Sequence, residues 1–304
     1  MLLKIALSVV AIGMGQAALA GQEACTNWLD GTFWQSAASS DVAECLAGEI
    51  AVNGRTSHGE TPLHLAVEHG RSPAILRMLL ERGADPDLTD EKGRTPLHVA
   101  AESAVDAAVP VTLLAWGADV EAALPGDTCE WPRRLCATRP LHLAAGRSDG
   151  IDIAAALIVA GADPDAEDEA GNRPLHLAAS IGATEAVRLL LQAGATHDAS
   201  DFDGETALHA AARQPEDVIQ VISLLLERGL SPDTPDDDEG VTPLILGTRY
   251  STEPAAVHLL LKASETPCYA DEKGRAALMM WDDNDRLARD DSYWALHEEC
   301  LKAE

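Results

Sequence analysis

Basic residues are scarce in this chain, and their scarcity excludes one class of partner. The 304 residues include 22 Lys and Arg against 50 Asp and Glu, which gives a formal net charge of −28 at pH 7. A surface with this charge repels polyanions, so we expect no binding to nucleic acid or to an anionic membrane through the bulk surface. A basic protein partner and an adaptation for solubility are the two explanations of the charge that stay open.

Long hydrophobic runs are also missing, apart from a short one near the N-terminus. Residues 5–14 are apolar, Lys4 is the only charge nearby, and Ala18-Leu19-Ala20 is a small-residue pattern before Gly21. These are the parts of a secretory signal peptide, and the run is too short to span a membrane comfortably. We therefore expect residues 1–20 to be a signal peptide. The mature chain is then periplasmic or secreted, with no membrane association after cleavage.

Motifs of common enzyme and metal-site classes are missing as well. The sequence contains no Cys-x-x-Cys pair and no phosphate-binding loop of the type Gly-x-x-x-x-Gly-Lys. The ten His residues cannot be paired by sequence with a Ser and an Asp, or with a free Cys. The sequence therefore predicts no enzymatic activity, no cofactor and no metal site.

A hexapeptide recurs along most of the chain. Its form at residues 61–66 is Thr-Pro-Leu-His-Leu-Ala, and successive copies start 34, 44, 34, 33 and 36 residues apart. A period near 33 is typical of a stacked array, in which each unit buries its apolar face against its neighbours. The copies occupy residues 61–66, 95–100, 139–144, 173–178, 206–211 and, in degenerate form, 242–247.

Each copy predicts two short helices followed by an extended finger. Pro62 stands at the first helical turn, where its missing N–H costs nothing, and the Thr61 hydroxyl can cap the helix. A second helix has apolar residues at helical spacing and stops near Gly83, which suits a left-handed C-terminal residue. A finger with its tip at residues 91–93 then leads to the next unit.

The hexapeptide, the paired Leu of the second helix and the repeated Gly-Ala-Asp triplet resemble the ankyrin repeat family. The resemblance covers roughly residues 30 to 300 and implies an all-α solenoid of about eight units with β-hairpin-like fingers. It also implies a non-catalytic protein–protein interaction module, here of an exported bacterial type. In that family the motif His is structural, which implies the same role for His64, His98, His142, His176 and His209.

The repeat frame divides the mature chain, 21–304, which we expect to form a single domain. Residues 26–60 are an atypical N-terminal cap, in which the bulky Trp28, Phe33 and Trp34 close the core. Residues 61–274 hold the central repeats. Residues 275–304 form a C-terminal cap that ends in a polar-faced helix from about residue 291 to residue 302.

All six Cys lie in the mature part of the chain, and an even number in an exported protein implies disulfides. The repeat frame places two Cys in each cap and two in one inserted loop. Since neighbours in this frame lie close together, we predict local pairs. They are Cys25–Cys45, Cys129–Cys136 and Cys268–Cys300.

The step of 44 residues contains an insertion, 123–137, in one finger. A Cys129–Cys136 bond would close a loop that presents Trp131, Arg133 and Arg134. Trp and Arg are enriched at binding hot spots, and insertions in repeats often lie on the binding face. In the alternative interpretation, Trp131 folds back onto neighbouring fingers and the two Arg pair with nearby carboxylates. We predict that these three residues contact a protein partner.

Two other fingertips carry residues that can add contacts. Phe202 would be an exposed aromatic side chain, either a contact residue or a single apolar residue without consequence. We predict Lys92, Phe202 and Asp203 as secondary contacts of the same partner.

Two classes of function remain open at this point. One is a protein-binding module, which we expect to be a monomer with a partner that the sequence does not identify. The other is a periplasmic protective or chaperone-like companion of a labile enzyme or cofactor.

Overall fold

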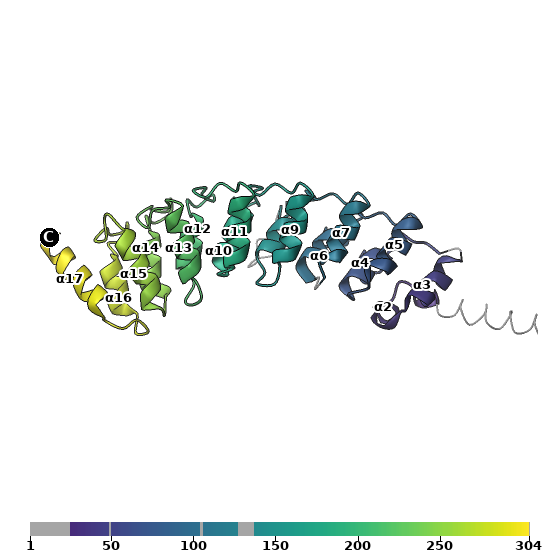
Figure 1. Cartoon of the computed structure of the whole chain (residues 1–304), viewed down its shortest axis with the longest axis horizontal. Coiled ribbons are helices and arrows are strands. Elements are labelled where there is room, and N and C mark those ends of the chain that lie inside the picture. Colours follow the sequence, from purple (N-terminus) through teal and green to yellow (C-terminus); the bar gives the residue numbers. More distant parts are fainter. Residues whose placement is uncertain (1–24, 49, 104–105, 127–136, 304) are drawn as a thin grey trace, which may run out of the picture. The chain divides into compact units, whose positions relative to one another are not determined.

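The computed structural model describes residues 25–48, 50–103, 106–126 and 137–303, and these form sixteen α-helices, one 3₁₀ helix and no extended strand. The chain divides into two units, Met1–Ala122 and Ala123–Glu304. Each unit is a stack of helix pairs (Figure 1). The predicted signal peptide and the centre of the inserted finger lie outside the described residues.

The first unit contains a short 3₁₀ helix, η1 (Cys25–Asn27), and three helix pairs. Inner helices pack on inner helices and outer helices on outer ones, so that α4 lies between α2 and α6. The pairs are α2 (Gly31–Ser36) with α3 (Ser39–Leu46), α4 (Pro62–Glu68) with α5 (Pro73–Glu81), and α6 (Pro96–Ser103) with α7 (Ala108–Ala115).

The second unit continues the same pattern with five pairs. The described residues thus contain eight pairs in all, which confirms the prediction of an all-α ankyrin-type solenoid of about eight units. The pairs are α8 (Pro140–Ala145) with α9 (Ile151–Val159), α10 (Pro174–Ser180) with α11 (Thr184–Gln192), α12 (Ala207–Ala212) with α13 (Ile219–Glu227), α14 (Pro243–Tyr250) with α15 (Pro254–Ala263), and α16 (Ala277–Asp283) with α17 (Asp291–Ala303).

The hexapeptide builds the inner helices in the way its residue types predict. Thr61 lies in extended conformation before α4, and its hydroxyl accepts a hydrogen bond from the His64 N–H. The last Ala of the motif is fully buried in five copies, and this small side chain lets neighbouring inner helices approach closely. These residues are Ala66, Ala100, Ala144, Ala178 and Ala211, each 0% exposed.

The N-terminal cap closes its end of the first unit with aromatic side chains, as predicted. Trp34 is fully buried, its ring centroid lies 5.0 Å from that of Trp28, and its indole N–H donates to the Trp28 carbonyl at 2.9 Å. A disulfide between Cys25 and Cys45 joins η1 to α3.

The C-terminal cap differs from its prediction in one respect. A disulfide joins Cys268 to Cys300 on α17, as predicted. The exposed face of α17 is polar only in part, however, because Trp294 and Leu301 are 57% and 59% exposed beside Glu298 and Lys302. Trp294 packs its ring edge to face against Tyr293 and His297, with centroids 5.0 and 5.7 Å apart, and it remains more than half exposed.

Candidate protein-binding surface

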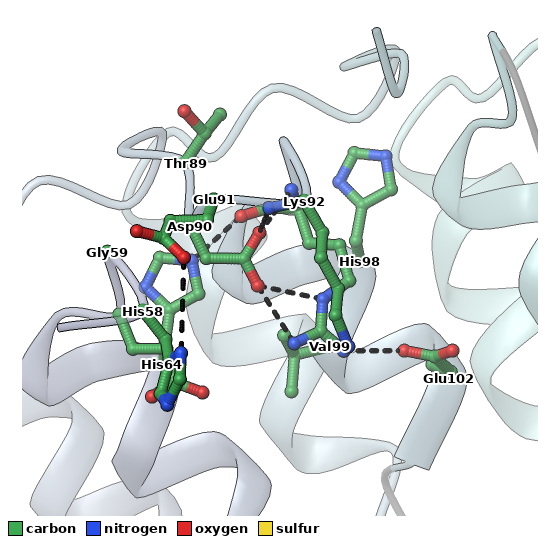
Figure 2. A network of polar contacts seen from close by, with 12 residues as sticks. His58, Gly59, His64, Thr89, Asp90, Glu91, Lys92, His98, Val99 and Glu102 are labelled. Carbon is green, nitrogen blue, oxygen red and sulfur yellow. Dashed lines mark hydrogen bonds and ion pairs between the residues drawn. The ribbon is translucent and has the colours of Figure 1, made fainter. Parts of the chain in front are cut away.

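Five of the described fingers are built around one Asp each, and in the first finger the Thr56 hydroxyl accepts the backbone N–H groups of His58 and Glu60 instead. Asp90 Oδ1 accepts hydrogen bonds from the Lys92 and Arg94 N–H groups at 2.9 and 2.8 Å, and Oδ2 accepts from Arg94 Nε at 2.8 Å (Figure 2). The Arg94 side chain also reaches Glu102 at 2.9 Å. Asp168, Asp201, Asp236 and Asp271 accept backbone N–H groups in the same way in later fingers. These loops satisfy their own backbone donors, so they hold one shape.

Neighbouring fingertips are joined by backbone hydrogen bonds within each unit. In the first unit, the Glu91 N–H donates to the His58 carbonyl at 3.0 Å (Figure 2). In the second unit, three bonds of the same kind connect successive tips. They run from Phe202 N to Ala170 O at 3.0 Å, from Asp237 N to Asp203 O at 2.9 Å, and from Glu272 N to Glu239 O at 2.9 Å. The tips therefore present their side chains in a fixed register.

The motif His residues hold each inner helix to the following finger. His64 Nδ1 accepts from the Thr61 N–H at 3.1 Å, so the proton is on Nε2, which donates to the Arg94 carbonyl at 2.8 Å. His98 contacts Thr95 in the same way, at 3.2 Å. Later copies bond the next finger at similar distances: His142 to Asn172 O, His176 to Ala199 O and His209 to Val241 O.

Burial favours the neutral form of four of these rings. Desolvation lowers the pKa of His64, His142 and His176 below the ordinary value, and it lowers the pKa of His209 from 6.5 to about 4. Because both ring nitrogens are engaged, the His residues serve the scaffold and lie outside the candidate surface.

At α14 of the second unit, ion pairs take the place of the hydrogen bond that the motif His makes to the following finger. Ile245 stands at the His position and is buried, so it cannot bond the finger at residues 271–275. Instead, Glu239 on the preceding finger accepts from Lys273 and Arg275, and Arg275 also pairs with Asp271 at 2.6 Å. These hydrogen bonds lower the pKa of Glu239. The sequence showed the missing His but gave no sign of this replacement.

The predicted contact residues fall into three groups. Lys92 is exposed at a fingertip of the first unit, and Asp203 is exposed at a tip of the second. Phe202 is 68% exposed, and its ring lies over Gly171 of the neighbouring tip. Gly171 has φ of 79°, and a Cβ there would lie 2.6 Å from the Phe202 ring, so this contact requires glycine.

The third group, Trp131, Arg133 and Arg134, lies outside the described residues, and so does the predicted disulfide of Cys129 and Cys136. The base of their finger is described. The Leu124 N–H donates to the Thr138 carbonyl, and the Ala137 N–H donates to the Leu124 carbonyl, both at 3.0 Å. The two chain segments at the base of the insertion are therefore hydrogen-bonded to each other.

Each unit also has a polar groove between fingers and inner helices, which sequence reasoning missed. The groove of the first unit has a volume of about 370 Å³ and includes His58, Asp90 and Lys92. The groove of the second has a volume of about 420 Å³ and includes Asp203, Glu205 and Arg249. The repeated Asp and Glu residues of the fingers were the available sequence signal for these grooves. The depth of a groove, however, depends on how the fingers pack against the inner helices.

Comparisons with known proteins agree with this architecture. Residues 46–100 match a family model described as ankyrin repeats (many copies), and residues 141–236 match one described as ankyrin repeats (3 copies).

The chain belongs to the ankyrin repeat family. The crystal structure of the human ASB11 ankyrin repeat domain is similar to it, with a TM-score of 0.64 and 25% sequence identity over 80% of this chain and 98% of that one. No curated protein matches the chain. Ankyrin repeats are generally interaction scaffolds rather than catalysts. Among the described residues, no helix is long and apolar enough to cross a membrane.

Proposed function

We propose that this ankyrin repeat chain is an exported, monomeric and non-catalytic module that binds a protein partner through its fingertips. The observation that carries the proposal is the row of tips joined by backbone hydrogen bonds, with Phe202 68% exposed on it. A large aromatic side chain held in a fixed position is a suitable anchor for a partner, because little conformational entropy is lost on binding.

The inserted finger, residues 123–137, adds residues beyond the repeat pattern. We propose that Trp131, Arg133 and Arg134 make the primary contacts, with Lys92, Phe202 and Asp203 on other tips as secondary ones. The paired base at Leu124 and Thr138 supports a finger that projects from the stack. Two cations beside an aromatic residue favour an acidic patch on the partner, in a chain whose net charge of −28 repels such a patch elsewhere.

Replacement of Trp131 by Ala is expected to weaken partner binding by about 2 kcal/mol and to leave the melting temperature unchanged. The partner is first captured by crosslinking in an extract of the exported compartment, and its affinity is then measured by calorimetry. Trp116→Ala is the matched control, because Trp116 is an exposed Trp, 44% accessible, at the end of α7.

Two results would contradict this assignment. A lower melting temperature with unchanged binding would show that Trp131 packs against the scaffold. Broad binding to unfolded chains, without one saturable partner, would favour the role of a protective companion.

Export is tested separately. The two disulfides of the described residues, Cys25–Cys45 and Cys268–Cys300, support an oxidising location. The protein recovered from its native host is expected to begin at Gly21 and to react with no thiol reagent unless it is first reduced. An intact Met1 together with free thiols would refute export. N-terminal sequencing and thiol titration give both measurements.

A further inference from the structure

The groove of the second unit is lined mainly by charged side chains and has a small apolar area. It lies between the fingers at residues 201–205 and 236–241, above α12 and α14, and has a volume of about 420 Å³. Leu246 and Val241, which are 4% and 9% exposed, contribute its apolar atoms, and Tyr250, which is 38% exposed, stands at its side. Such a groove can accept apolar side chains of an extended segment while its rim contacts polar groups.

Several charges of the groove neutralise one another. Glu205 pairs with Arg213, and Glu239 pairs with Arg275. These pairs hold the two fingers against the inner helices and the next finger. Since the carboxylates already have cationic partners, they contribute little to the binding of a further charge.

Two carboxylates of the rim are not used in this way. Asp203 and Asp238 are both exposed, and neither side chain makes a hydrogen bond or ion pair with any described residue. Their surroundings are strongly acidic, because the fingers at residues 201–205, 236–240 and 271–275 carry nine carboxylates and only two basic residues. Arg249 also lines the groove and forms no ion pair with a described residue; its guanidinium lies over the Tyr250 ring, 5.1 Å from the centroid. Two unpaired carboxylates against this one cation leave the groove with a net negative unpaired charge, which lies at its rim.

We infer that this groove binds an extended polypeptide segment in which Lys or Arg alternates with apolar side chains. The cations would lie at Asp203 and Asp238, and the apolar side chains would contact Leu246 and Tyr250. An acidic segment or a nucleic acid would be repelled by the carboxylates at the rim, and this repulsion would weaken its binding. The inference rests on the proposed protein-binding function and specifies the chemistry of the partner at this one surface.

The test uses the mature, oxidised chain and a fluorescent peptide in which Lys and Leu alternate. A second peptide has Gln in place of each Lys, and affinities are measured by fluorescence anisotropy. We expect the Lys peptide to bind, and the double variant Asp203→Asn, Asp238→Asn to lower its affinity by about tenfold. The melting temperature of the variant should not change, since neither side chain has a partner within the described chain.

A matched control removes the same charge from the same unit. Asp152→Asn with Asp285→Asn changes two exposed carboxylates outside the groove, and it should lower affinity by less than about threefold through long-range attraction alone. An equal loss in this control would overturn the inference, because binding would then depend on net charge. Equal affinity for the Gln peptide would overturn it as well.

The outcome separates this inference from the proposed function. If the Lys peptide fails to bind and Trp131→Ala still weakens partner binding, the groove is excluded and the fingertip function stands. If the Lys peptide binds at Asp203 and Asp238 while the Trp131 variant captures its partner normally, the inference is supported and the inserted finger is excluded as the primary contact.

Discussion

Acidification from pH 7 to pH 5 is expected to lower the stability of the second unit by about 2 kcal/mol through His209 alone. Burial lowers the pKa of this ring from 6.5 to about 4, so the folded chain keeps it neutral while the unfolded chain takes up a proton. Between these two pKa values the unfolded state binds more protons. The stability that the neutral His209 ring contributes is therefore complete above pH 6.5, and it is lost progressively as the pH falls toward 4.

Other titrating groups of the same unit modify the size of this effect. The pKa values of His142 and His176 are also lowered by burial, so both rings add to the loss. The pKa values of Asp201 and Glu205 are raised by burial, and these carboxyl groups act in the opposite direction because the folded state takes up their protons.

The control for this prediction is His209→Gln, which cannot titrate. Its stability is lower than that of the native chain at pH 7, and the difference should shrink by about 2 kcal/mol at pH 5. Because long repeat arrays do not always unfold in one step, stability is measured by hydrogen exchange of amides in α12 and α14. The same pH dependence in both proteins would show that His209 does not carry the effect.

Removal of the Cys268–Cys300 crosslink by double substitution with Ser is expected to cost about 3 to 4 kcal/mol, on the chain-entropy estimate for a closed loop of this size. The two residues are 32 positions apart. The loss should be local, because the stability of a repeat array is a sum of unit and neighbour terms. Hydrogen exchange should show protection lost in α16 and α17 and retained in α10.

The other cap supplies the comparison. Substitution of Cys25 and Cys45 by Ser should remove protection from α2 and α3 and leave α16 and α17 unchanged, since that disulfide lies in the first unit. A uniform loss of protection along the chain in either variant would be inconsistent with independent caps.

The sequence by itself determined the elements and most of their order. An ankyrin-type unit has local sequence requirements: a Pro after a capping residue, a small Ala in the inner helix and a Gly at the helix end. Because these requirements are local, they can be identified in the sequence of a single repeat. The placement of the cap cysteines and the exposure of Phe202 at a tip followed from the repeat frame alone. Both are observed in the structure.

The tertiary structure decided what neighbouring units do to one another. Ion pairs replace the absent His bond at Ile245, since Glu239 meets Lys273 and Arg275 only after the fingers stack. The groove has the same origin in part: Glu239 of one finger neutralises Arg275 of the next, whereas Arg213 pairs with Glu205 of its own repeat. Asp203 and Asp238 stay unpaired. Residues more than thirty positions apart become partners through stacking, and a charge pattern along one chain does not specify which charges will be matched.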